Sequence, residues 1–282
     1  MIRLTALILA TFFSVHAALA QNLVSLRQQN FPADLPAEDD NMEWKQYIYR
    51  EINLMEDGNM GLYCTREASE CHKGLFDMVF NLAVAKIIPI YRYNIDGNEV
   101  FSENTKVDIK DVLRNHRIFY QVKDGRIVVD TGDIPSNEIL TYYIKEEVSY
   151  NIANSSFQTR VIAFCPILVE DNEFLDGTER YPLFWVKYND VKPFLNNVTV
   201  IPDYRNVAKV MSVTDFFTRN MYKGDIYKVS NALGRTLNQI TDSDSALKVA
   251  QQHIEDDIRR IRKTTYNTYY NSSCNTEVGN SK

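Results

Sequence analysis

The chain has 282 residues, of which 45% are hydrophobic, and it carries a formal net charge of −6. A chain of this length can bury the core of one large domain or of two small ones. An acidic chain is a poor binder of the nucleic-acid backbone, so we expect no nucleic-acid partner.

Residues 1–20 have the pattern of a secretory signal peptide. Arg3 precedes an apolar run over residues 4–15, and a small-residue motif ends at Ala20, so we expect cleavage between Ala20 and Gln21. The apolar run is shorter than the roughly 20 residues that a membrane-spanning helix needs. Gln21 also stands where a lipoprotein would carry cysteine. We therefore expect an exported chain with no direct membrane insertion and no lipid anchor of its own.

The four cysteines differ in their surroundings. Cys64 and Cys71 flank a short polar segment, and in an oxidising compartment this spacing can close a small disulfide loop, with two free thiols as the alternative. Cys165 lies in the apolar run 161–168 and is expected to be a buried small hydrophobe. Cys274 lies in a polar segment without an evident local partner.

The N-terminal part of the exported chain is predicted to be an extended arm. Residues 21–41 are polar and contain two prolines and the acidic run Glu38-Asp39-Asp40. The ordered domain is expected to begin at residue 42. Over residues 42–54 the apolar positions fit one face of a helix as well as one face of a strand, so the period alone does not decide between them.

The rest of the chain mixes predicted helices and strands. Apolar spacing predicts a helix over 72–86, and Pro89 follows its end. Further predicted elements are a strand over 88–93, a helix after a capping motif at 105–108, a hairpin of 118–122 with 126–129, a short helix over 136–143, paired strands over 148–152 and 157–168, a strand over 181–188, a helical turn over 190–195 and a helix over 214–222.

The last predicted element is an amphipathic helix over residues 241–263, with its clear apolar stripe starting near residue 245. Residues 264–282 are polar and are expected to form a frayed, flexible tail. Because strands and helices alternate with short hairpins, we predict an α+β fold. It should contain a mostly antiparallel sheet, flanking helices and the C-terminal helix, with the main domain over residues 42–240.

One short motif suggests an enzyme. A hydrophobic strand running into Asp130-Thr131-Gly132 is how an aspartic protease presents a catalytic carboxylate, so an exported hydrolase using Asp130 is the alternative function. Such chemistry needs two carboxylates that share one proton, and the sequence contains only one motif of this kind. The motifs of metal, phosphate and dinucleotide sites are not found in the sequence, so we expect no cofactor and no enzymatic activity.

Aromatic residues are the positive signal for binding. The sequence has 17 Tyr and 2 Trp, and Tyr, Trp and Arg dominate interface hot spots. The alternative is that they form the core, which we favour for Phe184, Phe216 and Phe217. The candidate interface residues are Trp44, Tyr49, Arg50, Arg180, Tyr181, Tyr188, Tyr222 and Lys223.

A set of motifs is spread over residues 42–240. The motifs include Trp44-x4-Tyr49-Arg-Glu-Ile-Asn-Leu54, Tyr91-x-Tyr-x-x-Asp96-Gly-x-Glu-Val-Phe101, Asp133-Ile-Pro-Ser-Asn-Glu-Ile-Leu140, Arg180-Tyr-Pro-x-Phe-Trp-Val-Lys-Tyr188 and Met221-Tyr-Lys-Gly-Asp-Ile-Tyr-Lys228. In these motifs the chain resembles the GldN/PorN family of the gliding and type IX secretion machinery of Bacteroidetes, and the last two are the most specific. The C-terminal helix and the Cys64/Cys71 pair lie outside the resemblance.

The resemblance implies a non-enzymatic structural protein of the periplasm. Such a subunit would assemble in several copies with a GldK/PorK-type lipoprotein into a ring under the outer membrane. It would also contact the GldM/PorM-type protein that reaches out from the inner-membrane motor. The lipoprotein would supply the membrane anchor, which agrees with Gln21 at the expected cleavage site.

Overall fold

The computed structural model describes residues 43–63, 74–94, 97–151, 156–172, 177–196, 198–202 and 210–278. The expected signal peptide, the Ala20–Gln21 cleavage site, the arm over residues 21–41 and the Cys64/Cys71 pair lie outside the described residues. Among the helices of the described part, none has the length and apolar character that crossing a membrane requires.

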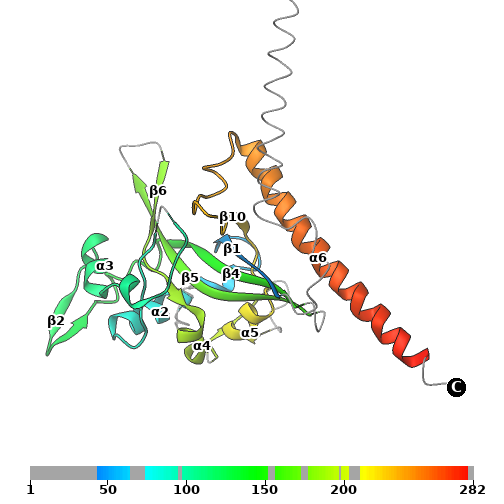
Figure 1. Cartoon of the computed structure of the whole chain (residues 1–282). Helices are drawn as coiled ribbons and strands as arrows, with labels where there is room; N and C mark the ends of the chain where they lie inside the picture. The colour runs from blue at the N-terminus through cyan, green and yellow to red at the C-terminus, as the bar shows by residue number, and fades with distance from the viewer. Residues whose placement is uncertain are drawn as a thin grey trace, which may run out of the picture.

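Three long antiparallel strands form the centre of the fold (Figure 1). They are β1 (Glu43–Asn53), β4 (Ile139–Asn151) and β5 (Ser156–Asn172). The short strands β10 (Asp225–Val229) and β6 (Gly177–Pro182) extend the sheet in the order β10-β1-β4-β5-β6, and β7 (Val186–Lys187) also pairs with β5. Two small sheets join β2 (Gln121–Lys123) to β3 (Arg126–Val128) and β8 (Thr199–Val200) to β9 (Met211–Ser212). The predicted α+β class with a mostly antiparallel sheet is confirmed.

The segment whose period was ambiguous is strand β1. It pairs with β4 without interruption from Glu43 opposite Asn151 to Asn53 opposite Thr141. Ile48 and Tyr49 point to opposite faces of the sheet and both are fully buried. A central strand covered on both faces carries large apolar side chains at consecutive positions, which is why neither period stood out in the sequence.

Two apolar clusters lie on one face of the sheet. The larger one packs Ile52, Ile144 and Phe164 against the short helices. These are α2 (Leu75–Val84), α3 (Ile109–Asn115), α4 (Tyr188–Leu195) and α5 (Val213–Thr218), with the 3-10 turns η1 (Met60–Leu62) and η2 (Glu103–Thr105) beside them. The smaller cluster packs Ile48 and Val148 against the last helix.

The opposite face is aromatic. Tyr49 and Cys165 from the sheet pack with Tyr91 and Trp185 in a third cluster, with Phe101 against its side. Two lysines, Lys145 and Lys228, are also buried on this face. The expected burial of Cys165 is confirmed, and its thiol is free.

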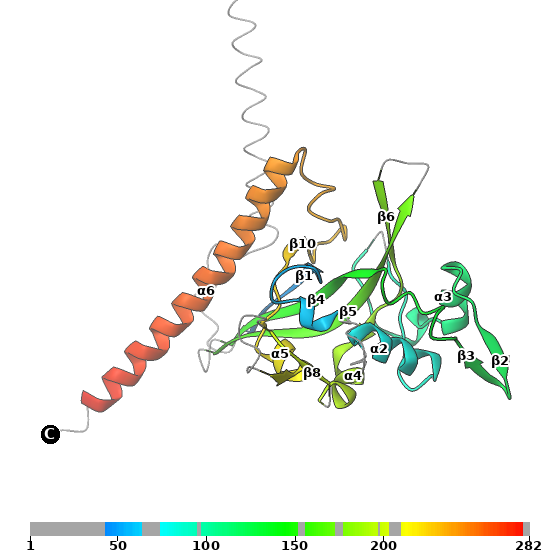
Figure 2. The same cartoon turned by 180° about the vertical axis from the view of Figure 1, so that it is seen from behind.

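Helix α6 (Asp244–Val278) is longer than predicted. Ile254 and Ile258 hold its first half against the sheet, and its second half runs on beyond the sheet toward the C-terminus (Figures 1 and 2). The helix therefore continues through residues 264–278, where the sequence predicted a frayed tail. Residues 264–278 contain no Gly or Pro, and Gly279 follows the last helical residue, so the sequence holds no helix breaker before that point.

Several local predictions are confirmed. Helices α2 and α3 lie inside their expected ranges, and β4 pairs with β5 as predicted. Asp108, not Thr105, caps α3, because its side chain accepts a hydrogen bond from the Lys110 amide. The hairpin turn between β2 and β3 places Asp124 at φ 51° and Gly125 at φ 75°, which is the geometry of a two-residue turn of this kind.

Other predictions are wrong. The expected helix over 136–143 gives way to the start of β4 at Ile139, because the ladder with β5 overrides the local capping signal at Ser136. The expected strand over 88–93 makes only isolated bridges at Tyr91. The strand expected over 181–188 stops at Pro182, which has no amide to donate, and continues only as β7. The helix expected over 214–222 ends at Thr218, and the backbone then turns at Asn220 with φ 49°.

Trp185 tests the aromatic face of the core. Its side chain is 0% exposed, stacks on Tyr93 and meets Tyr49 edge-on. Trp185→Ala should lower the free energy of unfolding by about 3–5 kcal/mol, because it leaves a large cavity. Trp185→Phe should cost less, since a ring remains and the indole N–H has no hydrogen-bond partner to lose. Urea unfolding of both variants checks this, and an unshifted midpoint for Trp185→Ala would contradict the packing.

Candidate partner-binding surface

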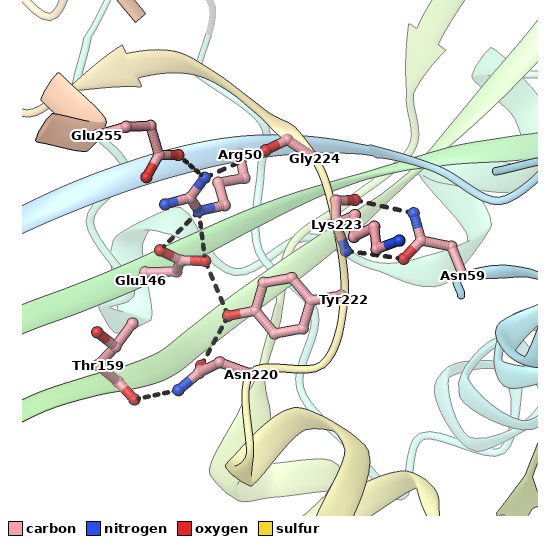
Figure 3. A network of polar contacts seen from close by, with 9 residues as sticks. All are labelled: Arg50, Asn59, Glu146, Thr159, Asn220, Tyr222, Lys223, Gly224 and Glu255. Atoms are coloured by element: carbon pink, nitrogen blue, oxygen red, sulfur yellow. Dashed lines mark hydrogen bonds and ion pairs between the residues drawn. The ribbon is translucent and has the colours of Figure 1, made fainter. Parts of the chain in front are cut away.

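The segment between α5 and β10 is fixed through Tyr222. Its ring is 7% exposed, and its hydroxyl donates to the carboxylate of Glu146 at 2.8 Å, with the side chain of Asn220 at 3.1 Å (Figure 3). Asn220 donates in turn to the Thr159 carbonyl on β5 at 3.1 Å. The junction is therefore tied to β4 and β5 from inside the fold.

Arg50 connects this junction to the rest of the molecule. Its Nε donates to Glu146 at 3.1 Å, its Nη1 donates to the Gly224 carbonyl at 3.1 Å, and it also forms an ion pair with Glu255 of α6. One guanidinium therefore links β1, β4, the segment before β10 and the last helix (Figure 3). A guanidinium suits this role because it has five donors in a fixed plane.

The environment sets the charge states of this pair. Burial raises the pKa of the Glu146 carboxyl above its ordinary value, although Arg50 and the Tyr222 hydroxyl act in the opposite direction. Burial opposes the charge of Arg50 as well, but Glu146 and Glu255 raise its pKa, so Arg50 remains a cation. The ion pair is therefore both buried and mutually dependent.

Asn59 holds the next residues of the junction. Its fully buried amide donates to the Asn53 and Lys223 carbonyls at 2.8 Å each and accepts from the Lys223 amide at 3.0 Å. At position 224 a Cβ would lie 2.3 Å from the Glu51 carbonyl oxygen, so only glycine fits there. The role of Gly224 is therefore to allow this close approach of two backbones.

The candidate interface residues fall into two groups. Tyr49 and Tyr188 are 0% and 6% exposed, and Tyr222 is equally enclosed, so these three belong to the core in this conformation. The reason is that each lies on a covered side of the sheet or under a helix. Trp44, Arg50 and Tyr181 are partly buried, whereas Arg180 and Lys223 are exposed. The core assignment of Phe184, Phe216 and Phe217 agrees with their burial.

Arg180 and Tyr181 lie together near one edge of the sheet. Arg180 pairs with Glu51 of β1 at 2.6 Å, although β6 and β1 are not neighbours in the sheet. Tyr181 meets His116 edge-on, with ring centroids 6.2 Å apart, and burial lowers the pKa of that histidine. These consecutive strand residues point to opposite faces of β6, and arginine and tyrosine are both residue types that are frequent in interface hot spots.

A half-open groove of about 490 Å³ lies between the first half of α6 and the sheet. Val148, Phe157 and Ile258 supply its apolar lining, and Arg219 and Arg262 stand on its exposed side. The Arg262 guanidinium lies 5.0 Å from the centre of the Phe157 ring. The groove therefore combines apolar surface with positive charge.

Asp130 has none of the surroundings that a catalytic carboxylate needs. It is exposed, two positions after the end of strand β3, and the neighbouring residues 131–133 are exposed as well. A protease carboxylate is enclosed and shares its proton with a second one. Within the described part of the chain, no group of His, Cys, Asp and Glu side chains is placed to hold a metal ion.

Sequence reasoning missed three residues that organise this region: Asn59, Glu146 and Glu255. Glu146 lies within the charged run Lys145-Glu146-Glu147, which normally indicates an exposed strand, yet all three are buried. The useful signal was Arg50 on β1, because a buried cation requires a carboxylate nearby. The alternation of strand positions alone did not show which carboxylate would supply it.

These features define a class of protein before any comparison: an α+β protein with a tightly connected interior, grooved surfaces and a long projecting helix. A sequence model of the family described as "Gliding motility associated protein GldN" matches residues 37–267. The chain belongs to the GldN family and is thereby a component of the gliding motility and type IX secretion machinery. This family is not a known enzyme family. A search of curated proteins found no match to the chain.

The family match is wider than the resemblance found by motif. It begins at residue 37 and continues to residue 267, so it includes the acidic run of the arm, the Cys64/Cys71 segment and the packed half of α6. We had placed the C-terminal helix and the cysteine pair outside the resemblance, and the match corrects this. The helix that pairs Glu255 with Arg50 is therefore part of the family's domain.

The buried ion pair generates a quantitative prediction. Arg50→Met should lower the free energy of unfolding by about 3–5 kcal/mol, because it leaves Glu146 buried without its cation. Tyr222→Phe removes one hydrogen bond to the same carboxylate and should cost about 1–3 kcal/mol. The measurement is urea unfolding at neutral pH.

Two further variants control this experiment. Arg219→Met removes an exposed arginine close by and should change stability by no more than about 0.5 kcal/mol. Adding Glu146→Gln to Arg50→Met should recover part of the loss, because the two residues interact directly. Full additivity of these two changes would argue against the ion pair.

Proposed function

We propose that this chain is a non-enzymatic structural subunit of the type IX secretion and gliding machinery. It would reside in the periplasm and assemble with a GldK/PorK-type outer-membrane lipoprotein into a ring of many copies. It would contact the GldM/PorM-type protein that connects the ring to the motor. The observation that carries the proposal is membership of the GldN family over residues 37–267.

The shape of the molecule supports a role in assembly. Helix α6 projects beyond the sheet on one side, and the β2–β3 hairpin projects on the opposite side (Figures 1 and 2). The hairpin region exposes Phe119 and Val122, which are 60% and 55% accessible. Two different projecting elements at opposite ends suit head-to-tail contacts, and contacts of this kind close into rings.

The contacts inside the fold also support a role in assembly. A subunit of a large ring must keep its shape while neighbours bind at several places. The contacts of Arg50 and Asn59 fix the junction before β10 to β1, β4 and α6, so the sheet and the last helix are held as one unit. The exposed arginines at positions 180 and 219 remain on the surface of that unit.

Co-assembly tests the proposal directly. The signal-bearing chain is expressed together with a GldK/PorK-type lipoprotein, the membranes are extracted, and the product is examined by light scattering and electron microscopy. We expect the two proteins to purify together as a ring-shaped particle that is far larger than either chain. A monomer that ignores the lipoprotein would contradict the proposal.

Surface variants locate the contacts. Phe119→Glu and Arg180→Glu should each reduce ring yield several-fold while leaving the melting temperature of the isolated chain nearly unchanged, because both side chains are exposed. Tyr181→Ala should act in the same direction as Arg180→Glu. Arg235→Glu, an equal charge change at another exposed site, is the matched control. Normal rings from well-folded Phe119→Glu and Arg180→Glu variants would remove these residues from the interface.

A further inference from the structure

The groove beside α6 carries positive charge that the described part of the chain does not neutralise. Two carboxylates line the groove, Glu146 and Glu255, and both are engaged by Arg50. Arg219 and Arg262 form no ion pair with any described residue. An open groove with two available guanidinium groups and an apolar lining suits a short acidic peptide that also carries apolar side chains.

The chain contains such a peptide shortly before β1 in the sequence. Glu38, Asp39 and Asp40 form a run of three acids, and Phe31 and Leu35 precede it. Asp40 stands three positions before the first residue of β1, Glu43. The family match starts at residue 37, so this run lies inside the region that defines the family.

The register of the sheet shows that the run can reach the groove. Trp44 on β1 lies opposite Tyr150 on β4, which lies opposite Phe157 on β5. Strands are spaced by about 4.8 Å, so Trp44 and Phe157 are about 10 Å apart and face the same side. Both side chains pack against the cluster under α6. An extended chain advances about 3.3–3.6 Å per residue. The residues between Asp40 and Glu43 can therefore bridge the distance from the start of β1 to Phe157 and to Arg262 beside it.

We propose that the acidic run Glu38-Asp39-Asp40 of the chain's own arm docks on Arg219 and Arg262 in the groove between α6 and the sheet. Exposed ion pairs are individually weak and are screened by salt. A tether of a few residues compensates, because it holds the acids near the arginines at an effective concentration in the millimolar range. The docked arm would cover Phe157 and connect the start of β1 to the last helix.

Hydrogen exchange on the isolated chain from residue 21 onward tests the proposal. In low salt, amides of residues 37–42 should exchange at least about tenfold more slowly in the wild type than in Arg219→Glu/Arg262→Glu. The slow exchange should disappear in about 1 M NaCl, where the screening length falls to about 3 Å. Arg259→Glu reverses one arginine charge on α6 outside the groove and should leave the exchange unchanged.

A charge exchange provides the stronger test. Glu38→Lys/Asp39→Lys/Asp40→Lys alone should abolish the protection, and combining it with Arg219→Glu/Arg262→Glu should restore it. The arm variant changes no described residue, so it remains informative if the groove variant is unstable. Fast exchange in the wild type, protection that survives high salt, or protection that rises with protein concentration and thus comes from a second copy would each overturn the proposal. The measurement uses the isolated chain, so its failure is separate from failure of ring assembly.

Discussion

The buried contact between Arg50 and Glu146 is the constraint on which the rest of this structure depends. A carboxylate enclosed in the sheet is unfavourable unless a cation and hydrogen-bond donors satisfy it. Arg50 satisfies it from β1 and Tyr222 from the junction before β10, while the same guanidinium reaches Glu255 on α6. Because one carboxylate needs all these partners, the edge strand and the last helix have a single arrangement relative to the central strands. A sheet whose last helix was joined only by apolar contacts would have no comparable restriction on its register.

The aromatic face of the sheet also buries charged groups, and it stabilises them by a different kind of interaction. Lys145 and Lys228 are both buried there, and among the described residues both ammonium groups share one carboxylate, that of Glu99. Burial lowers the pKa of both lysines. The Lys145 ammonium donates to the Glu99 carbonyl and lies 4.8 Å from the centre of the Tyr47 ring, and Lys228 lies 4.7 Å from that of Tyr49. The negative faces of the rings thus replace part of the missing anion, which explains why tyrosine is abundant in a region that is mostly core.

The burial of these tyrosines marks the limit of what could be predicted from the sequence. The pairing of β4 with β5, the hairpin at Asp124 and the apolar stripe of α6 follow from local patterns, and they were predicted. The burial of the tyrosines could not be predicted from local patterns. Tyrosine is a residue type enriched at interfaces, and the burial of Tyr49 and Tyr222 depends on charged neighbours that are distant in the chain. Glu146 lies 96 positions from Arg50, and no local pattern connects them. The charged run 145–147 looked exposed for the same reason, since its partners come from both faces of the sheet. Of the candidate interface residues, Arg180 and Lys223 are exposed and Tyr181 is partly exposed, and their role at an interface stays a prediction.

The division between interior and surface has a consequence for assembly. Among the described residues, the buried charged groups contact opposite charges, carbonyl oxygens or tyrosine rings, so a partner that approaches the sheet would disrupt contacts before forming new ones. Exposed groups without such partners among the described residues include Arg219 and Arg262 in the groove beside the packed half of α6, and apolar side chains are exposed near the β2–β3 hairpin. Binding at these places requires only the desolvation of exposed side chains, which costs less free energy than breaking the buried contacts of the sheet. The Arg50–Glu146 pair and the contact of Arg50 with Glu255 hold the first half of α6 against the sheet, so a partner that binds in the groove meets a surface whose shape is already fixed.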